Sequence, residues 1–336
     1  MSQKRMALLL INLGTPDEPT RPAVKRYLTQ FLNDKYVIDI PWLFRKILVN
    51  GIIIPFRVKR STALYQQVWT PQGSPLTLYT ESLKHKLQAK LNPDTMVFTA
   101  MRYQNPPIAS TLAKIKAENF DKLVVLPLYP HFADSTTTST LEEVKRVIKH
   151  WDEKPEIQFI EEFHDHPAYL TAFANKINSY KPERFDHIVF SYHGLPNSHI
   201  EKIHRQYALP DCDPENDTAE HCKVCYRAAC YHTTKLLAEQ LNLPESSYTT
   251  TFQSRLSKNW LEPFSDKTLI DLAHMGCKRV LVVAPAFVAD CLETIIELGV
   301  EYKDLFIENG GQELTWVESL NADDAWVEGI RKIVSL

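Results

Sequence analysis

The sequence predicts an α/β protein built from two similar domains, each with a parallel four-stranded sheet flanked by helices. Short, continuously apolar runs alternate with longer amphipathic segments along the whole chain. Such runs are typical of parallel strands that are buried on both faces. The runs fall into two series, and 336 residues are enough for two domains of ordinary size. Both series also contain the same short motifs, which indicates a duplicated domain.

Eight apolar runs mark the expected strands. They are 7–13, 96–101, 123–128 and 157–160 in the first series, and 188–192, 248–252, 280–284 and, more weakly, 314–317 in the second. The segments between them have helical periodicity, for example 139–151 and 222–241. This alternation of strands and helices favours two parallel sheets.

The repeated motifs lie where strands are expected to end. LLLINLGTP and IVFSYHGLP both finish in Gly-x-Pro, at Gly14 and Gly194, and VVLPLYP and VVAPAFV share V-V-x-P. If the halves are duplicates, their sheets should face each other across a cleft, and ligands should bind beyond the carboxyl ends of the strands. One half has Leu13 before its glycine and the other has His193. This difference predicts a single reactive site.

Composition excludes several functions. The net charge is −3, and no basic tract is interleaved with aromatic residues, so nucleic acid is not an expected partner. The nine glycines never form G-x-G-x-x-G or G-x-x-x-x-G-K, which argues against a nucleotide-dependent enzyme. No small-residue cleavage site follows the first apolar run, and no run is long enough to span a bilayer. We therefore expect a cytoplasmic protein.

His193 is the first candidate for chemistry. It follows the apolar run 188–192 and precedes Gly194 and Pro196, so a turn at the strand end should point it into the cleft. Imidazole titrates near neutral pH and binds metals when neutral. A hydrogen-bonded structural histidine is the alternative, since the chain has twelve histidines.

Glu293, Glu297 and Glu301 are the second candidates. Their spacing of four places them on one face of a helix, which begins after the run 280–284. A solvated helix face is one interpretation of this acidic row. The other is a route that passes cations through oxygen ligands, because hard cations prefer such ligands.

The segment 36–60 is apolar with basic flanks. A packed core helix is one interpretation, but Pro41, Gly51 and Pro55 should interrupt a long helix. The alternative is a flexible apolar lip over a flat hydrophobic ligand or against a membrane surface.

Four of the six cysteines lie within nineteen positions. Cys212, Cys222, Cys225 and Cys230 form the pattern C-x9-C-x2-C-x4-C. Disulfides rarely persist inside cells, so this cluster predicts a metal site, with zinc or an iron–sulfur cluster as the candidates. Zinc ribbons usually have two C-x2-C pairs, and this pattern has only one. The asymmetry favours a [2Fe-2S] cluster over zinc.

Taken together, these motifs closely resemble the ferrochelatase family. The matching segments are LLLINLGTP, QGSPLTLYT, MRYQNPP, VVLPLYPHFADSTTTS, FSYHGLP, TFQSRLSKNWLEP and APAFVADCLETIIELGVEY, in order over nearly the whole chain. The resemblance implies Rossmann-like, chelatase-type domains with the active-site cleft between them. It implies a lyase that inserts Fe²⁺ into protoporphyrin IX to form protohaem and releases two protons.

The resemblance also assigns residues. It implies that His193 and Glu293 are the catalytic pair that meets the iron substrate, and that Glu297 and Glu301 continue an acidic row for metal or protons. The implied porphyrin-pocket residues are Tyr65, Arg102, Tyr103, Ser135, Trp260 and Phe287. The segment 36–60 matches the family's apolar lip, with peripheral membrane contact in many members, and a partner in the haem pathway is a further expectation.

The domains implied by these matches are residues 1–163, with the C-terminal helix 318–336 packing back on them, and residues 164–317, with the cysteine-rich insertion 208–231. Some animal members place a cluster cysteine where this chain has Asp134, and a histidine where it has Cys291. A bacterial subset resembles the present arrangement, with four internal ligands for [2Fe-2S]. The alternatives are a chelatase for coproporphyrin or another metal, and a tetrapyrrole-binding redox sensor centred on the cluster.

Overall fold

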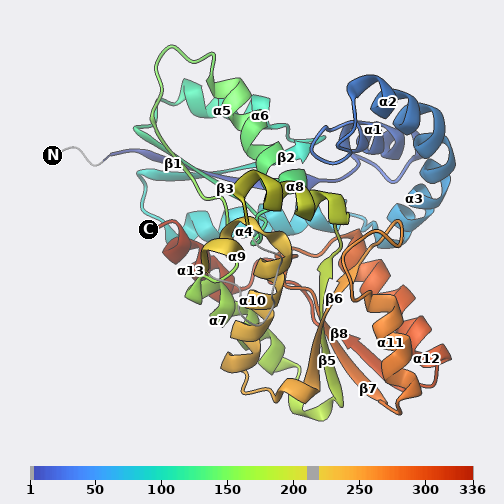
Figure 1. Ribbon diagram of the computed structural model, residues 1–336. Coiled ribbons are helices and arrows are strands. Elements are labelled where there is room, and N and C mark those ends of the chain that lie inside the picture. The colour runs from blue at the N-terminus through green and yellow to red at the C-terminus, as the bar shows by residue number, and fades with distance from the viewer. Residues whose placement is uncertain (1–3, 210–218, 336) are drawn as a thin grey trace. The chain divides into compact units, whose positions relative to one another are not determined.

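The computed structural model describes residues 4–209 and 219–335 and divides into two compact units. The first unit holds the chain up to Tyr129, then Ala133–Glu161, and finally the chain from Ala322 onward. The second unit holds Pro130–Phe132 and Glu162–Asn321. Figure 1 shows a sheet with helices around it in each unit.

The first unit contains one sheet and most of the N-terminal helices. Its strands are β1 (Met6–Gly14), β2 (Thr95–Tyr103), β3 (Lys122–Pro127) and β4 (Glu156–Phe159). Its helices are α1 (Arg21–Leu32), α2 (Trp42–Ile47), α3 (Ile54–Val68), α4 (Pro75–Lys90), α5 (Ile108–Ala117), α6 (Ser139–Ile148) and α13 (Asp324–Ile333), with π-helices η1 (Leu48–Ile53) and η2 (Asp134–Thr138).

The second unit repeats this plan. Its strands are β5 (His187–His193), β6 (Tyr248–Gln253), β7 (Arg279–Val283) and β8 (Glu313–Trp316). Its helices are α7 (Pro167–Ser179), α8 (Asn197–Tyr207), α9 (Ala219–Val224), α10 (Tyr226–Gln240), α11 (Ser265–His274) and α12 (Tyr302–Glu308), with 3₁₀ turns η3 (Pro182–Arg184) and η4 (Glu245–Ser247) and the π-helix η5 (Glu293–Glu301).

Both sheets are parallel and have the same strand order. The first is β2-β1-β3-β4 and the second is β6-β5-β7-β8. The eight predicted strands are thus all present, and the predicted fold class is confirmed. Each order places the first strand of its half in the interior of the sheet, where both faces are covered. This explains why Leu8 to Ile11 are fully buried whichever face they point to.

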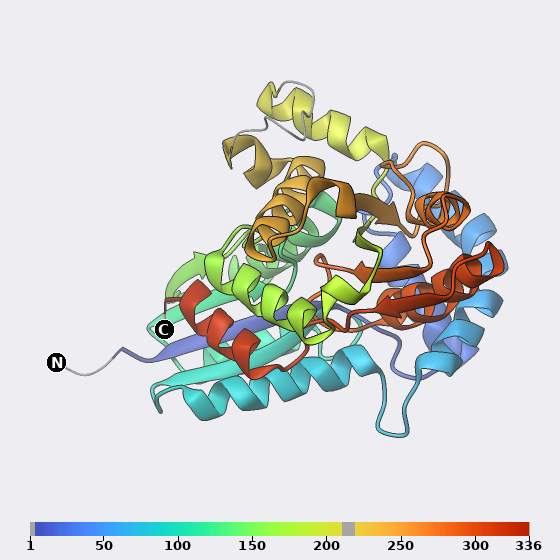
Figure 2. The ribbon, with the colours of Figure 1, turned by 90° about the horizontal axis from the view of Figure 1, so that it is seen from below.

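Hydrophobic packing encloses each sheet between helices. In the first unit α5 and α6 pack against alternate residues of β1, β2 and β3, such as Leu9 and Val125. Helix α4 contacts β1 and β2, and α13, red in Figure 2, lies beside it. In the second unit α11, α12 and η5 pack against Val189 and Val282, and α10 contacts both β6 and α7.

Two predicted helices differ from those observed. Residues 222–241 form two helices rather than one, because Cys225 has an extended backbone and begins α10 instead of continuing α9. Residues 42–68 are helical throughout, so Gly51 and Pro55 do not interrupt them as predicted. Pro55 lies in the first turn of α3, directly after the π-helix η1. A proline is tolerated there because its missing N–H is not needed for the helical ladder.

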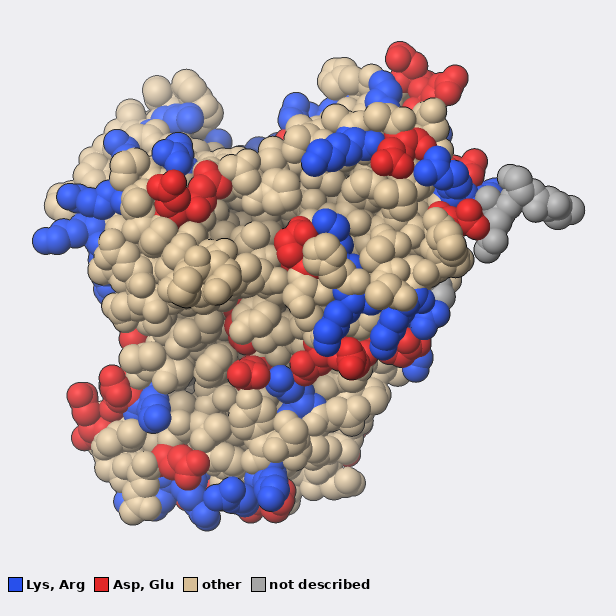
Figure 3. All heavy atoms as spheres, turned by 180° about the vertical axis from the view of Figure 1, so that it is seen from behind, with Lys and Arg blue, Asp and Glu red and all other residues tan. Residues whose placement is uncertain are grey.

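Figure 3 shows the charged side chains on one face of the molecule. On the face drawn in Figure 3, acidic and basic side chains are interspersed, with uncharged surface between them. Neither sign forms a continuous field across this face, which agrees with the small net charge of −3.

Candidate active site

His193 lies at the carboxyl end of β5 in the second unit. It pairs with Gln253, the last residue of the neighbouring strand β6. The next residue, Gly194, donates its N–H to the Gln253 carbonyl oxygen at 2.8 Å. A Cβ atom on Gly194 would lie 2.9 Å from that same oxygen, so only glycine allows the approach. The histidine is therefore placed at the strand ends, where parallel α/β sheets usually bind ligands.

One hydrogen bond fixes the tautomer of His193. Its Nδ1 lies 2.7 Å from the carbonyl oxygen of Gly194. A carbonyl oxygen only accepts hydrogen bonds, so Nδ1 carries the hydrogen and the neutral ring presents the lone pair of Nε2. The ring is half-buried, and the aromatic rings of Trp260 and Phe287 lie 6.4 and 6.3 Å from it, centroid to centroid. The structure thus brings three of the predicted site residues together.

Glu297 is held by a dense set of donors. Its carboxylate accepts hydrogen bonds from the Ser254 backbone N–H at 2.8 Å, from the Ser254 hydroxyl, from the Gln253 amide at 3.2 Å and from the Tyr302 hydroxyl at 3.0 Å. Ser254 has a positive φ of 62°, an uncommon conformation for a residue with a side chain. Glu297 is therefore a fixed group, and the interpretation of the acidic row as a solvated helix face does not apply to it.

The environment of Glu297 suits proton transfer. Burial raises the pKa of its carboxyl above the ordinary value, while the Ser254 hydrogen bonds and the nearby His193 imidazole act in the opposite direction. Burial disfavours the charged form, and donors and positive charge favour it. A buried carboxyl with a shifted pKa, close to a histidine at the strand ends, is a candidate functional group.

Glu293 begins the π-helix η5, the element that also carries Glu297. Its carboxylate accepts a hydrogen bond from the Cys291 thiol at 3.0 Å, and its carbonyl oxygen accepts one from the Gln253 amide at 3.4 Å. Gln253 therefore connects η5 to the strand end at which His193 lies. Glu301, the last member of the row, is exposed. The π-helical turn is wider than an α-helical one, and such turns are frequent at functional sites.

Asp290 anchors the start of this region. Its buried carboxylate accepts hydrogen bonds from Thr294, the Ser319 backbone and Asn321, at 2.7 to 3.0 Å. These bonds join the segment before η5 to the loop after β8. Asp290 therefore positions η5.

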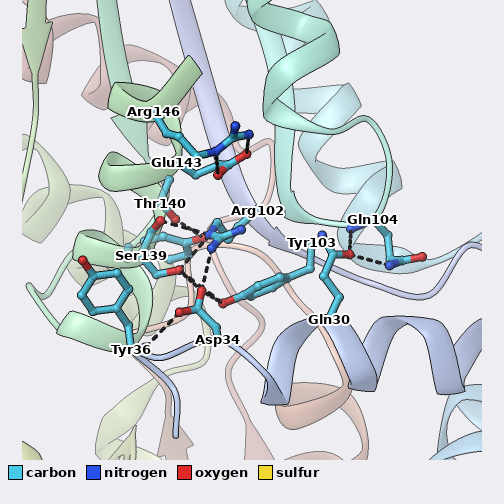
Figure 4. A network of polar contacts seen from close by, with 11 residues as sticks. Gln30, Asp34, Tyr36, Arg102, Tyr103, Gln104, Ser139, Thr140, Glu143 and Arg146 are labelled. Atoms are coloured by element: carbon cyan, nitrogen blue, oxygen red, sulfur yellow. Dashed lines mark hydrogen bonds and ion pairs between the residues drawn. The ribbon is translucent and has the colours of Figure 1, made fainter. Parts of the chain in front are cut away.

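Arg102 and Tyr103 form a separate network in the first unit (Figure 4). The Arg102 guanidinium lies 2.6 Å from Asp34, which also accepts hydrogen bonds from Tyr103 at 2.9 Å and Ser139 at 2.6 Å. The side chains of Arg102 and Asp34 are only 16% and 5% exposed, so this ion pair is largely desolvated. Burial, followed by the Asp34 charge, raises the pKa of Tyr103 well above its ordinary value.

This network lines a pocket of about 490 Å³. The lining residues are Gln30, Asn33, Asp34, Lys35, Tyr36, Arg45, Arg102, Tyr103, Ser139, Glu142, Glu143 and Arg146. Besides Asp34, six of these residues are charged, so the pocket suits polar or charged groups of a ligand. The other two predicted pocket residues of this unit lie elsewhere: Tyr65 is buried on α3 beside Tyr27, and Ser135 is half-buried in η2.

The predicted cluster ligands are only partly described. Cys212 lies outside the described residues, while Cys222, Cys225 and Cys230 are all buried. The Sγ atom of Cys225 lies 3.3 Å from Nε2 of His204.

Two histidines adjoin these thiols. Ligand atoms of His204, His221 and Cys225 lie within 4.8 Å of one another. Sequence spacing alone did not indicate either histidine as a neighbour of the cysteines.

Sequence reasoning missed several residues of these sites. Asp34 and Ser254 carry no motif that marks them, and Asp34 meets Arg102 across 68 positions. Gln253 could have been found, because T-F-Q ends the strand adjacent to the one that ends in S-Y-H. Tyr302 follows Glu301 directly and would have pointed away from Glu297 on an ideal α-helix, so only the observed helix geometry reveals the contact.

Proteins with similar sequences include ferrochelatases of several bacteria. The chain is 42% identical over 341 residues to a ferrochelatase of Coxiella burnetii, covering 99% of this chain and 94% of that protein. It is 40% identical to one from Legionella pneumophila, with 98% and 99% covered, and 39% identical to one from Pseudomonas putida, with 96% of each covered.

Solved structures give the same fold. SirB from Bacillus subtilis with Fe³⁺ matches with a TM-score of 0.53 at 12% identity, over 98% of this chain and 95% of that one. The sirohydrochlorin chelatase SirB in complex with cobalt matches with the same TM-score. At such low identity these matches show the architecture alone. The family model described as Ferrochelatase, however, matches residues 5–336, and with the relatives at about 40% identity it shows that the chain belongs to the ferrochelatase family.

Proposed function

We propose that this chain inserts Fe²⁺ into protoporphyrin IX to form protohaem and that His193 and Glu293 are its catalytic pair. Membership of the ferrochelatase family carries the activity. Two observations support the site. The oriented imidazole of His193 lies beside two aromatic rings, and the Gln253 amide at the adjacent strand end bonds the Glu297 carboxylate and the Glu293 carbonyl oxygen.

The porphyrin dictates what the site must do. Its four nitrogens lie in one plane and two carry protons, so iron reaches all four only if the ring buckles and both protons leave. Binding energy from apolar contacts can hold the distorted ring near the transition state. Trp260 and Phe287 beside His193 offer such contacts, and the Nε2 lone pair of His193 can accept a pyrrole proton.

The glutamates would bind the incoming Fe²⁺ and take up the protons that leave the porphyrin. Carboxylates bind Fe²⁺ through oxygen and can remove protons, and the row of Glu293, Glu297 and Glu301 extends from the site to an exposed position. The raised pKa of Glu297 supports a share in proton export.

Four residues of the first unit are proposed to contact the porphyrin. Arg102 and Tyr103 line the polar pocket of the first unit, and the Arg102 guanidinium would donate hydrogen bonds to a propionate group there. Tyr65 and Ser135 complete the proposed porphyrin contacts. Because Nη2 of Arg102 already donates to Asp34 and Nε to Ser139, a propionate would have to use the remaining guanidinium N–H groups.

The direct test replaces the imidazole. His193→Ala should abolish haem formation from protoporphyrin and Fe²⁺ under anaerobic conditions, while porphyrin binding, followed by fluorescence, persists. His274→Ala serves as the control, because His274 is an exposed residue of α11. Iron insertion by the His193 variant at a near-normal rate would overturn the assignment.

The choice of substrate in the same assay distinguishes two alternative functions. A chelatase for coproporphyrin or for another metal would prefer coproporphyrin over protoporphyrin, or Co²⁺ over Fe²⁺, in the same assay. A cluster-based tetrapyrrole sensor would bind porphyrin without metal insertion. The family assignment favours protoporphyrin and iron over both.

We also propose a [2Fe-2S] centre held by Cys212, Cys222, Cys225 and Cys230. The three described thiols are buried in a short segment, which fits a site that excludes solvent from a cluster. Binding of the cluster by these cysteines would contribute to the folding of this segment. The competing candidate is zinc, and it is favoured by the nitrogen–sulfur set of His204, His221 and Cys225.

Spectroscopy of the purified protein separates these two. A [2Fe-2S] centre gives visible absorption that bleaches on reduction, with two irons per chain, and it should be lost in Cys230→Ser. A zinc site gives no visible absorption, and its metal content should instead fall in His204→Ala.

Peripheral membrane contact is the final proposal. Six large apolar side chains between residues 42 and 56 are exposed, up to 82% for Phe56; they are Trp42, Leu43, Phe44, Ile47, Ile52 and Phe56. Basic residues follow them on α3, an arrangement typical of interfacial helices. Among the described residues, no helix is long and apolar enough to cross a bilayer. We propose a cytoplasmic enzyme that attaches to the membrane surface, and a partner of the haem pathway is the other candidate for this face.

Vesicle flotation tests the attachment. The wild type should float with vesicles that contain anionic lipid, and Phe56→Ser combined with Trp42→Ser should not. Equal flotation of both proteins would contradict the proposal. Absence of binding for both would likewise contradict membrane attachment and would favour a protein partner on this face.

A further inference from the structure

A cluster of histidines in the second unit has no part in the chemistry described above. His164 and Asp165 lie just before α7, and His232 lies in α10. One nitrogen of each histidine and one carboxylate oxygen of Asp165 lie within 4.8 Å of one another. A third imidazole, His131, lies beside them, with its ring centroid 5.8 Å from that of His164.

Glu162 prepares His164 as a ligand. The carboxylate of Glu162 lies 2.8 Å from Nδ1 of His164, so Nδ1 donates and the neutral ring presents its lone pair at Nε2. His164 is fully buried, and its Nε2 atom has no hydrogen-bond partner among the described residues. A carboxylate behind the imidazole is the usual arrangement around metal-binding histidines, since it fixes the ring and makes it more basic.

The other two imidazoles also present unused nitrogens. Thr233 donates its hydroxyl hydrogen to the His164 carbonyl oxygen, so its oxygen accepts the bond from Nε2 of His131 at 2.9 Å. The hydrogen of His131 is therefore on Nε2, and its buried Nδ1 holds a lone pair. Within the described part of the chain, neither Nδ1 of His131 nor the buried Nδ1 of His232 has a hydrogen-bond partner.

Three buried imidazole nitrogens without partners in one place call for an explanation, because buried polar atoms are normally paired. Burial lowers the pKa of His131 well below the ordinary value and also lowers the pKa of His232, with His164 acting in the same direction on both. Neutral imidazole is the form that binds metals.

We propose that His164, Asp165 and His232 bind a divalent first-row transition metal ion such as Zn²⁺ or Fe²⁺, with His131 adjacent as a further nitrogen donor. Two imidazoles and one carboxylate are a frequent ligand set for both ions. Ligands at about 2.0–2.2 Å from zinc lie roughly 3–4 Å apart, so the observed separations need only small side-chain rotations. Asp165 and His232 are partly exposed, which gives an ion a route from solvent.

We expect the bound ion to stabilise the folded protein by linking two elements. The ion would join the segment before α7 to α10, two elements that already pack together. An ion that binds only the folded protein stabilises it by mass action. The site would therefore act on stability and leave the proposed catalytic residues untouched.

Zinc content measures the site directly. Full-length protein is dialysed against micromolar Zn²⁺ and the zinc per chain is counted. Because the cysteine segment and the glutamates can also bind zinc, the comparison is between variants. His232→Ala and Asp165→Asn should each hold about one zinc fewer per chain than wild type, and His274→Ala should match wild type. Zinc should raise the Tm of wild type more than that of the two site variants.

A second substitution guards against a merely structural effect. His232→Cys supplies another zinc ligand at the same position and should retain the zinc that His232→Ala loses. Equal zinc content in wild type, His232→Ala and Asp165→Asn would overturn the proposal. So would binding that appears only at millimolar zinc. Both site residues are partly exposed, so the variants are expected to fold, and haem formation checks that they have done so.

Discussion

His193 and Gln253 occupy matching positions at the ends of two neighbouring parallel strands. The Gln253 amide reaches the carbonyl oxygen of Glu293 and the carboxylate of Glu297, so it ties the π-helix η5 to the strand end that carries the imidazole. The relative placement of imidazole and carboxylates therefore depends on a residue with no acid–base chemistry of its own.

Glu293→Gln tests the proposed role of the first glutamate. The amide keeps the size of the side chain but loses the charge that binds iron and the capacity to accept a proton. We expect turnover to fall at least 100-fold, which corresponds to about 2.7 kcal/mol or more. Initial rates of haem formation measure it. Glu308→Gln, at the end of α12, is the control, and a loss of less than threefold for Glu293→Gln would remove this residue from the mechanism.

Ser254→Ala tests the donors around Glu297. Hydrogen bonds to the ionised carboxylate lower its pKa, so removal of the hydroxyl should raise that pKa further above its ordinary value. If the ionised form takes up protons during the reaction, the acid limb of the pH–rate profile should move to higher pH. Ser257→Ala, an exposed substitution in the same loop, should leave the profile in place. An unchanged acid limb in Ser254→Ala would separate Glu297 from proton transfer.

Asp34→Ala tests the network in Figure 4. It leaves the largely buried Arg102 without its carboxylate and should lower the free energy of unfolding by about 3 kcal/mol or more. Glu143→Ala breaks the more exposed pair with Arg146 and should cost less than about 1 kcal/mol. Urea denaturation gives both values. Similar losses of unfolding free energy in the two variants would mean that burial does not make the Asp34 pair more important for stability than the exposed pair.

His187→Gln tests a pH dependence of stability. Burial lowers the pKa of His187, the first residue of β5, so the folded state takes up its proton less readily than the unfolded state. The associated stability is fully present above the unfolded pKa of about 6.5 and is lost as the pH falls below it. His187→Gln should therefore lose less stability than wild type between pH 7 and pH 5. Parallel curves for the two proteins would contradict this prediction, and His274→Gln is the control.

The strands could be predicted from the sequence because a parallel strand that is buried on both faces appears as a continuous local run of apolar residues. Leu8 to Ile11 are apolar at every position, and such a run needs no knowledge of its neighbours. His193 and Gly194 were likewise marked by their place at the end of such a run.

The contacts that hold the site were beyond sequence reasoning because they are set by tertiary structure. Asp34 meets Ser139 across 105 positions, and nothing near either residue indicates the other. The π-helices were also missed, since the apolar periodicity around Glu297 does not differ visibly from that of an α-helix. Pro55 was expected to interrupt a long helix because proline lacks a backbone N–H, but the chain is helical on both sides of it.

A π-helix follows the third strand in both halves: η2 comes after β3 and η5 after β7. A π-helical turn amounts to an α-helical turn with one residue inserted. The two halves therefore share this departure from α-helical geometry at the same point of their topology. The side chains on the two π-helices differ: η2 presents the hydroxyls of DSTTT, and η5 presents glutamates. The same type of turn at the same topological position thus carries acid–base groups in one half and neutral hydroxyls in the other.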